Sequence, residues 1–286
     1  MSALMQRLNA YYRLVRLDRP IGNMLLLWPT LWGLWIAADG LPPWNILAIF
    51  VLGTFLMRAA GCAINDFADR KIDPHVKRTD QRPLAAGEIQ AWEAVMVFVV
   101  LALVAFGLAL QLNRLALLLS IPAVILAGSY PFAKRYTYLP QAHLGMAFAA
   151  GIPMGFAALT GQVPALAWLL VLITLLWTIV YDTFYAMVDR DDDLKIGVKS
   201  TAVLFGRHDR LITGLLQLAV IGLLVVLGCW KGYGLWFYLG VAVGAGHFVW
   251  QQFLIRERQR EPCFQAFLNN HRFGMAIFAG LLLQTL

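Results

Sequence analysis

Long apolar stretches limit the folds open to this chain more than any other feature. Of its 286 residues, 60% are hydrophobic and 14% are charged, whereas a soluble domain carries about 25% charged residues. Too few polar residues remain to cover a water-soluble core. A helix that crosses a bilayer needs about 20 mostly apolar residues. About nine segments approach this length, and they are 21–38, 44–64, 91–112, 115–130, 142–160, 166–182, 211–230, 235–254 and 272–286. The sequence therefore predicts an all-α, polytopic membrane protein.

The loops between these segments are of two kinds. One kind is short and nearly uncharged (38–43, 111–114, 160–164 and 231–234), with Arg114 and Lys231 as its basic residues. The other kind, together with the N-terminal segment, is rich in bases: Arg7, Arg13, Arg16, Arg19, Arg70, Lys71, Lys77, Arg78, Arg82, Lys134, Arg135, Arg190, Lys195, Lys199, Arg207, Arg210, Arg256, Arg258 and Arg260. Because basic loops stay in the cytoplasm, we expect the N-terminus and these loops to be cytoplasmic. An odd number of crossings then places Leu286 on the opposite side.

Segment 1–20 is basic and mildly amphipathic, without the apolar region of a cleaved signal, so we expect a helix on the cytoplasmic membrane surface. The net charge of +7 does not indicate nucleic-acid binding, because the bases form no continuous stripe with interleaved aromatic residues. Cys62, Cys229 and Cys263 are scattered, so they indicate neither a disulfide framework nor a zinc site.

The acidic residues gather at the cytoplasmic ends of two predicted spans. Asp66, Asp69 and Asp73 follow the second span, and Asp182, Asp189, Asp191, Asp192 and Asp193 follow the sixth. Asn65, Asp69 and Asp73 are spaced i, i+4, i+8, and Asp189 and Asp193 repeat the i, i+4 spacing. On a helix, such residues lie along one face.

Two stripes of carboxylates are unfavourable unless something compensates for their charge. Like charges one turn apart repel, and ionisable groups at membrane depth usually mark a substrate or ion site. Mg²⁺ resolves the conflict, since it binds one or two carboxylates and shares its other positions with water and substrate phosphates. Either run alone is compatible with a solvated loop that forms weak ion pairs. However, the stripes share an offset of 120 residues, as in an internal repeat with a site between its halves.

Several segments resemble the UbiA superfamily of intramembrane prenyltransferases. Residues 65–73 are similar to its NDxxDxxxD motif, and residues 181–197 are similar to its second aspartate motif. LDRPIGNMLLLWPTLWGLW (17–35), HVKRTDQRPLAAGEI (75–89), YPFAKRYTYLPQ (130–141) and KSTAVLFG (199–206) resemble its bacterial 4-hydroxybenzoate polyprenyltransferase branch. The similarity runs along nearly the whole chain.

This resemblance implies one integral-membrane domain over 1–286, with two pseudo-repeated halves carrying motifs near 65–73 and 182–193. It implies about nine helices around a central cavity open to the cytoplasm, and a location in a bacterial inner membrane. It also implies Mg²⁺-dependent transfer of a polyprenyl group from polyprenyl diphosphate to the ring carbon ortho to the hydroxyl of 4-hydroxybenzoate, in ubiquinone biosynthesis.

With this reaction in view, roles can be assigned to the residues. We expect Asp69 and Asp73 to bind one Mg²⁺ and Asp189 and Asp193 the other, with Asn65 and Asp66 close by and Asp182 and Asp192 in support. Candidates for binding the diphosphate are Lys77, Arg78, Lys134, Arg135 and Lys195. Candidates for the benzoate carboxylate are Arg19, Arg58 and Arg135, and for stabilising the allyl cation Phe67, Tyr130 and Tyr185. Each aromatic residue is equally compatible with ordinary packing, and Arg58 with a structurally paired arginine.

Other functions remain open from the sequence. Another aromatic acceptor is compatible with the same motifs. From a different class, the acids could line the path of a cation- or proton-coupled transporter, but that function favours carboxylates near the middle of the membrane. The prenyl tail length and the oligomeric state have no visible signature.

Overall fold

The computed structural model of the chain describes residues 3–285, and those residues contain helices and loops but no strand. The α-helices are α1 (Ala3–Leu14), α2 (Ile21–Ala38), α3 (Trp44–Asp69), α4 (Ala91–Ala109), α5 (Arg114–Ala133), α6 (Pro140–Ala149), α7 (Gly151–Thr160), α8 (Ala165–Ile196), α9 (Thr201–Phe205), α10 (Asp209–Lys231), α11 (Leu235–Leu254) and α12 (Arg260–Thr285). Three 3₁₀ turns are η1 (Asp73–His75), η2 (Gly206–His208) and η3 (Ile255–Glu257).

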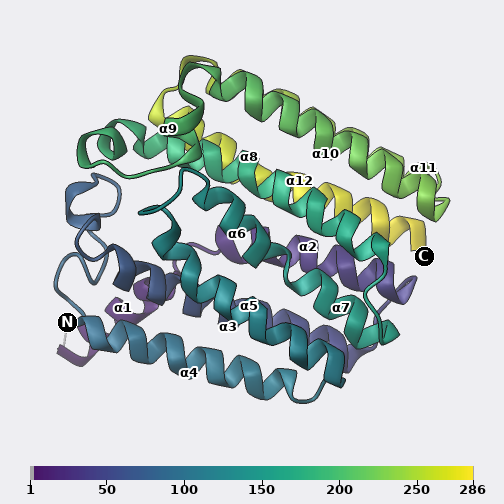
Figure 1. Cartoon of the computed structure of the whole chain (residues 1–286), viewed down its shortest axis with the longest axis horizontal. Coiled ribbons are helices and arrows are strands. Elements are labelled where there is room, and N and C mark those ends of the chain that lie inside the picture. The colour runs from purple at the N-terminus through teal and green to yellow at the C-terminus, as the bar shows by residue number, and fades with distance from the viewer. Residues whose placement is uncertain (1–2, 286) are drawn as a thin grey trace.

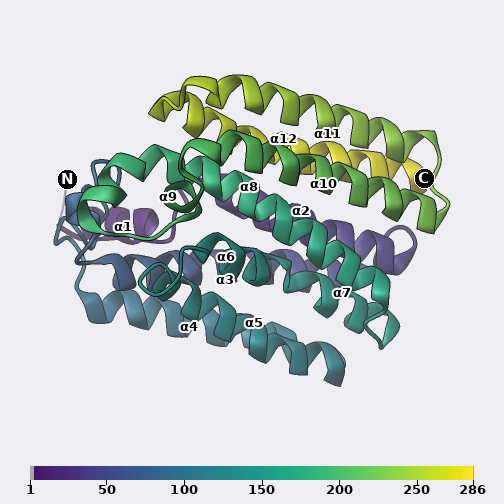
Figure 2. The same cartoon turned by 45° about the horizontal axis from the view of Figure 1, so that its top comes forward.

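The long helices run side by side, and the N- and C-termini lie at opposite ends of the bundle (Figures 1 and 2). Seven helical segments within 3–285 are long and apolar enough to cross a membrane: Ile21–Ala38, Trp44–Asp69, Ala91–Ala109, Arg114–Ala133, Pro140–Thr160, Ala165–Ile196 and Thr201–Lys231. Two more long helices, α11 and α12, run beside them (Figure 2). The predicted polytopic all-α membrane fold is therefore confirmed, with the number of spans close to the predicted one. Leu286, Met1 and Ser2 fall outside the described residues.

Two prolines that fall within predicted spans behave differently. Pro122 lies inside the continuous helix α5. Pro153, in contrast, lies four residues after Ala149, where α6 ends and the chain restarts as α7. A proline ring clashes with the carbonyl four residues earlier and removes one helical hydrogen bond, which accounts for a break at this point.

Tryptophan rings form the centre of the packed half of the bundle. Trp32 of α2 stacks on Trp177 of α8 with centroids 5.2 Å apart, and Phe273 of α12 packs against both rings. Both indole N–H groups are satisfied, because Trp32 donates to the carbonyl of Gly274 (3.2 Å) and Trp177 donates to Asn270 Oδ1 (2.9 Å). Buried indoles need such acceptors, so these contacts fix how α2, α8 and α12 pack together.

Helices α4 and α5 pack much more sparsely. Their buried residues are Glu93, Ala94 and Ala109 of α4 and Ala116, Pro131 and Ala133 of α5. In both views α4 lies on the side of the molecule opposite α11 (Figures 1 and 2). The remaining surface of these two helices is free to face lipid and, as described below, a cavity.

Helices α3 and α8 are longer than one membrane crossing requires. They have 26 and 32 residues, compared with about 20 for a span. Their C-terminal ends, which carry the two acidic segments, therefore continue beyond the apolar region toward the end of the bundle where α1 lies (Figure 1). Helix α1 is held there by Arg7 and Tyr11, which both donate to Glu93 of α4.

Candidate functional site

A cavity of about 690 Å³ lies between α2, α3, α4, α5, α6, α7, α8 and α12. Along α4 its lining runs from Phe98 to Ala109 and continues to Leu112, a distance of about 20 Å at 1.5 Å per residue. Val99, Leu103 and Phe106 line this cavity and are also more than 40% exposed. The apolar arm of the cavity is therefore open along α4 toward the position of the lipid.

A smaller, polar pocket of about 120 Å³ adjoins this cavity. Six residues line both spaces: Asn65, Arg78, Arg82, Tyr130, Asp182 and Tyr185. The polar pocket is also lined by Asp69 of α3, by Asp189 and Asp193 of α8, and by Lys134. The two acidic segments, 120 residues apart in the sequence, thus meet at one pocket, as the sequence predicts for a site between two related halves.

The acids of the first motif all have basic partners. Lys134 Nζ lies 2.5 Å from Asp69 Oδ2, and Asn65 Nδ2 donates to the same oxygen at 3.2 Å. Asp66 is 1% exposed and accepts two hydrogen bonds from Arg16 (2.8 and 3.1 Å). These pairs give the buried carboxylates at the end of α3 an opposite charge nearby.

Arg82 joins Asp66 to Asp73, at 3.2 and 3.0 Å. Burial lowers the pKa of Arg82, but the carboxylates of Asp66 and Asp73 raise it more strongly, so the pKa lies above its ordinary value and the side chain stays charged. Helix α3 ends at Asp69, and Asp73 lies in η1 beside Pro74. Residues before proline disfavour the helical conformation, so the predicted stripe does not continue to Asp73 on one helix.

The second motif contains both paired and free carboxylates. Arg78 donates to both oxygens of Asp189, at 3.0 Å and 2.5 Å, and its guanidinium lies 4.2 Å from the centre of the Tyr185 ring. In the part of the chain that the structure describes, the carboxylates of Asp182 and Asp193 have no hydrogen-bond or ion-pair partner. Two carboxylates therefore remain available to a ligand in this pocket.

The donors in the polar pocket fit a hard divalent cation in their chemistry. Asp69 Oδ1 is buried without a hydrogen-bond partner, and Asp182 and Asp193 add free carboxylate oxygens, the ligand type that Mg²⁺ prefers. However, among residues 3–285 no three acidic, histidine or cysteine side chains are close enough together to form a metal site by themselves. Any metal here would share its ligands with water or substrate oxygens, as is usual for Mg²⁺.

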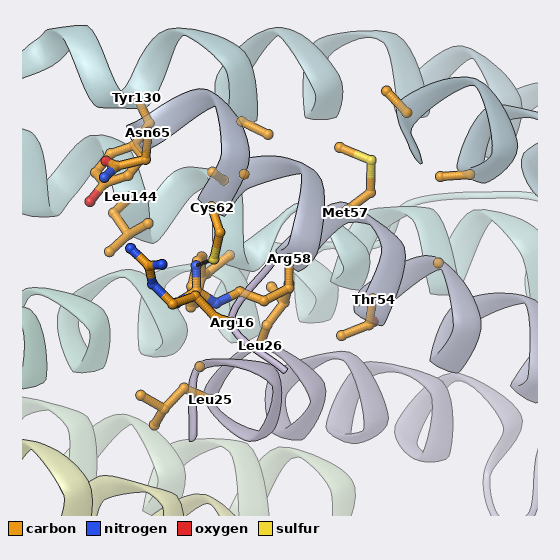
Figure 3. A pocket seen from close by; sticks show the side chains of 18 of the residues that line it. Arg16, Leu25, Leu26, Thr54, Met57, Arg58, Cys62, Asn65, Tyr130 and Leu144 are labelled. Carbon is orange, nitrogen blue, oxygen red and sulfur yellow. Dashed lines mark hydrogen bonds between the residues drawn. The ribbon is translucent and has the colours of Figure 1, made fainter. Parts of the chain in front are cut away.

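Arg58 lies deep in the large cavity. It extends from α3 into the cavity beside Cys62 and toward Arg16 (Figure 3). Its Nη1 donates to Cys62 Sγ at 3.0 Å, its Nε is buried without a partner, and within 3–285 no carboxylate pairs with it. A buried guanidinium without a paired carboxylate is unfavourable, so Arg58 is available to an anionic group that enters the cavity.

The structure brings most, but not all, of the predicted site residues together. Those that line the two cavities are Arg19, Arg58, Asn65, Asp66, Asp69, Arg78, Tyr130, Lys134, Asp182, Tyr185, Asp189 and Asp193. Six others do not line either cavity: Phe67, Asp73, Lys77, Arg135, Asp192 and Lys195. Arg135 is exposed and donates to the carbonyl of Ala68, while Lys77 and Lys195 are exposed on loop and helix surfaces.

Five site residues were not among the sequence predictions. Lys199 lines the polar pocket, Arg16 and Arg82 hold Asp66, and Phe264 and Phe267 of α12 line the large cavity near Tyr185. In the sequence, both arginines stood out only as basic residues of the cytoplasmic segments. Arg82 also lies in segment 75–89, which resembles the prenyltransferase family. The two phenylalanines follow a connector whose sequence carries no motif.

The fold and the site together define a class of protein. It is a multi-pass membrane protein with a carboxylate- and arginine-lined pocket at one end of an apolar cavity that opens toward lipid. The model of the UbiA prenyltransferase family matches residues 26–277, and the chain belongs to this family.

Similar proteins cover nearly the whole chain. A protein named 4-hydroxybenzoate octaprenyltransferase from Alkalilimnicola ehrlichii is 61% identical over 98% of this chain and 96% of its own length. One of the same name from Vibrio campbellii is 57% identical over 97% of this chain and 98% of its own length.

Solved structures agree on the fold. The apo structure of a UbiA homologue from Aeropyrum pernix has a TM-score of 0.83 at 25% identity, over 95% of this chain and 99% of that one. A UbiA homologue from Archaeoglobus fulgidus, solved with DMAPP and Mg²⁺, has a TM-score of 0.70 at 18% identity and covers 94% of this chain and 98% of that one.

Proposed function

We propose that this protein transfers a polyprenyl group from polyprenyl diphosphate to the ring carbon ortho to the hydroxyl of 4-hydroxybenzoate, an early membrane step of ubiquinone biosynthesis. One C–O bond of the donor breaks, one C–C bond forms, diphosphate leaves and the ring loses a proton. The main structural support is that the polar pocket, which has cationic side chains for an anion, adjoins the apolar, lipid-facing cavity. The names of relatives at 57–61% identity support the acceptor.

The polar pocket would bind the diphosphate. Arg78, Lys134 and Lys199 line it and supply cationic donors. We propose Mg²⁺ as the cofactor, held by Asp69, Asp189 and Asp193, with Asn65 and Asp182 beside it. When bound, Mg²⁺ would act as a Lewis acid that neutralises charge on the leaving group. Asp73 stays a predicted ligand, and in this structure it holds Arg82.

The large cavity would hold the prenyl tail and the acceptor. Its apolar arm along α4 and α5 keeps water away from the allylic carbon, so that the ring competes successfully as nucleophile. Tyr130, Tyr185 and Phe267 line this space, and aromatic rings can stabilise a nearby cationic carbon. Arg58 would bind the acceptor carboxylate and thereby orient the ring.

We also propose a bacterial inner-membrane location, with the N-terminus and the site facing the cytoplasm. The arginine and lysine residues of the loops gather at the end of the bundle that carries the polar pocket, in agreement with the positive-inside rule. At that side both a charged donor headgroup and a water-soluble acceptor are accessible.

A transfer assay tests the proposal. Membranes that contain the protein are supplied with 4-hydroxybenzoate, a polyprenyl diphosphate and Mg²⁺, and the prenylated acid is quantified. We expect product that is lost in Asp189→Ala and after EDTA treatment and is retained in Asp191→Ala, whose side chain is 73% exposed. If the intact protein forms no product, other aromatic acceptors are tested next, and failure of all of them would return the transporter function to consideration.

A further inference from the structure

The C-terminal end of α8, which continues beyond the apolar region, forms two sets of ion pairs with neighbouring segments. Neither set faces the polar pocket. On a helix, Arg190 and Asp192 flank the line that joins Asp189 and Asp193, one on each side. Arg190 donates to Asp209 at the start of α10, and Arg260 at the start of α12 donates to both oxygens of Asp192, at 3.1 and 3.2 Å. Asp189 and Asp193 therefore face the polar pocket, whereas Arg190 and Asp192 contact the neighbouring helices α10 and α12.

Asp209 is the centre of the first set. It is fully buried and receives a second arginine, Arg258, whose Nε lies 3.0 and 3.1 Å from the two carboxylate oxygens. Arg258 has a left-handed backbone (φ 54°), and its side chain also donates to the carbonyl of Arg207 (2.8 Å). A non-glycine residue in this conformation is unfavourable, and the side-chain contacts help to offset this cost, together with the hydrogen bond from the Arg258 backbone N–H to the carbonyl of Ile255 (3.0 Å).

Arg258 lies in the short connector between α11 and α12, and Arg260 is the first residue of α12. Neither residue lines either cavity, yet Arg260 contacts α8 at Asp192, and Arg258 reaches Arg190 through Asp209. Asp192 is therefore engaged away from the pocket, which argues against the supporting metal-ligand role that its position in the motif predicts.

We propose that these two sets of ion pairs, which we name the α8 clamp (Arg190–Asp209–Arg258 and Asp192–Arg260), are positioning residues that hold Asp189 and Asp193 in place for the metal-bound diphosphate. This inference rests on the proposed function. A helix end that projects beyond the bundle bends easily unless its flanks are fixed, and ligand orientation by such outer contacts typically changes metal affinity about 10- to 100-fold.

Arg260→Gln is the decisive variant, because it leaves the α8 sequence unchanged. Removing a positive charge near the site would by itself tighten Mg²⁺ binding, whereas loss of positioning weakens it. We expect the Mg²⁺ concentration for half-maximal activity to rise about 10-fold with both substrates saturating. Arg260→Lys should recover part of this loss. Arg256→Gln is the matched control. It also removes one arginine charge close to the start of α12, at an exposed pair with Glu257, and should leave the Mg²⁺ requirement unchanged.

A second measurement is independent of activity. Backbone amide exchange of segment 186–196 in the full-length protein in lipid nanodiscs should increase in Arg260→Gln, while exchange of 21–38 stays unchanged. The charge exchange Asp192→Arg with Arg260→Asp should restore protection. An unchanged or lowered Mg²⁺ requirement, or unchanged exchange of 186–196, would overturn the α8 clamp. If the wild-type protein works without divalent metal, the proposed metal function fails instead, and amide exchange alone decides whether the clamp holds α8.

Discussion

Replacing Gly22 by alanine should weaken acceptor binding by displacing Arg58. Gly22 lies in the first turn of α2, where a Cβ would sit 2.3 Å from both Nε and Nη2 of Arg58 and 2.7 Å from its Cζ. Because non-bonded heavy atoms settle at about 3.5–4.0 Å, the guanidinium has to move by more than about 1 Å. The backbone itself is not weakened, since alanine favours a helix over glycine by about 1 kcal/mol.

The size of the effect follows from what Arg58 is proposed to bind. A hydrogen bond to a charged group contributes about 1.5–3 kcal/mol, which equals about 10- to 150-fold in an equilibrium constant. We therefore expect the KM for 4-hydroxybenzoate to rise at least about 10-fold in Gly22→Ala. The KM for polyprenyl diphosphate should stay the same, since its diphosphate would bind in the polar pocket and its tail in the apolar arm along α4 and α5.

Steady-state kinetics in membranes, with each substrate varied in turn, measures both values. Gly53→Ala is the matched control, because Gly53 lines the same cavity on α3 and its Cβ would meet nothing within 4 Å. In an Arg58→Ala background, Gly22→Ala should cause little further loss, since the two changes act through one side chain. A normal acceptor KM in Gly22→Ala, or an equal loss in both backgrounds, would refute the reasoning.

Three further changes test other parts of the site. Lys134→Met should raise the KM for polyprenyl diphosphate, because it removes a cation from the pocket and leaves Asp69 without its 2.5 Å partner; substrate titration at fixed acceptor measures this, and an unchanged donor KM would contradict it. Ala102→Trp should fill the apolar arm and slow a long-chain donor far more than dimethylallyl diphosphate, and equal slowing of both donors would count against a tail in this arm. Gly274→Ala should lower stability by about 1–3 kcal/mol without altering either KM, because its Cβ would lie 2.4 Å from the Trp28 ring; thermal unfolding in detergent measures this, with an unshifted Tm as the opposing result.

Hydropathy predicted the membrane fold well, but the span it predicted for α8 is shorter than the helix. The predicted span stops at residue 182, whereas α8 continues to Ile196. Apolar content reports where a helix enters water, not where it ends. Residues such as Asp189 and Lys195 remain compatible with a solvated helix, so the end of α8 had to come from the structure, where Gly197 adopts the left-handed conformation that closes a helix.

The acidic spacing predicted the meeting of Asp69 with Asp189 and Asp193 at one pocket, but not the partners of these residues. Which arginine reaches which carboxylate depends on the path of the loop between α3 and α4, and nothing local in the sequence fixes that path. Arg82 bridges Asp66 and Asp73 across this loop. Such long-range pairs follow from tertiary packing, whereas i, i+4 spacing follows from helix geometry alone.

The ion pairs in the polar pocket also indicate how a charged substrate could enter without a large electrostatic penalty. The pocket is lined by equal numbers of acidic and basic side chains, namely Asp69, Asp182, Asp189 and Asp193 with Arg78, Arg82, Lys134 and Lys199. Buried charges are tolerated when opposite charges offset them, and here Lys134 pairs with Asp69 and Arg78 with Asp189. A diphosphate accompanied by divalent cations carries little net charge, so it leaves this balance nearly unchanged. Asp69 and Asp189 would then turn from Lys134 and Arg78 to the metal, and the released cations would turn to the phosphate oxygens. Each group thus exchanges one opposite charge for another, which explains how strongly basic residues and the proposed metal ligands share one pocket.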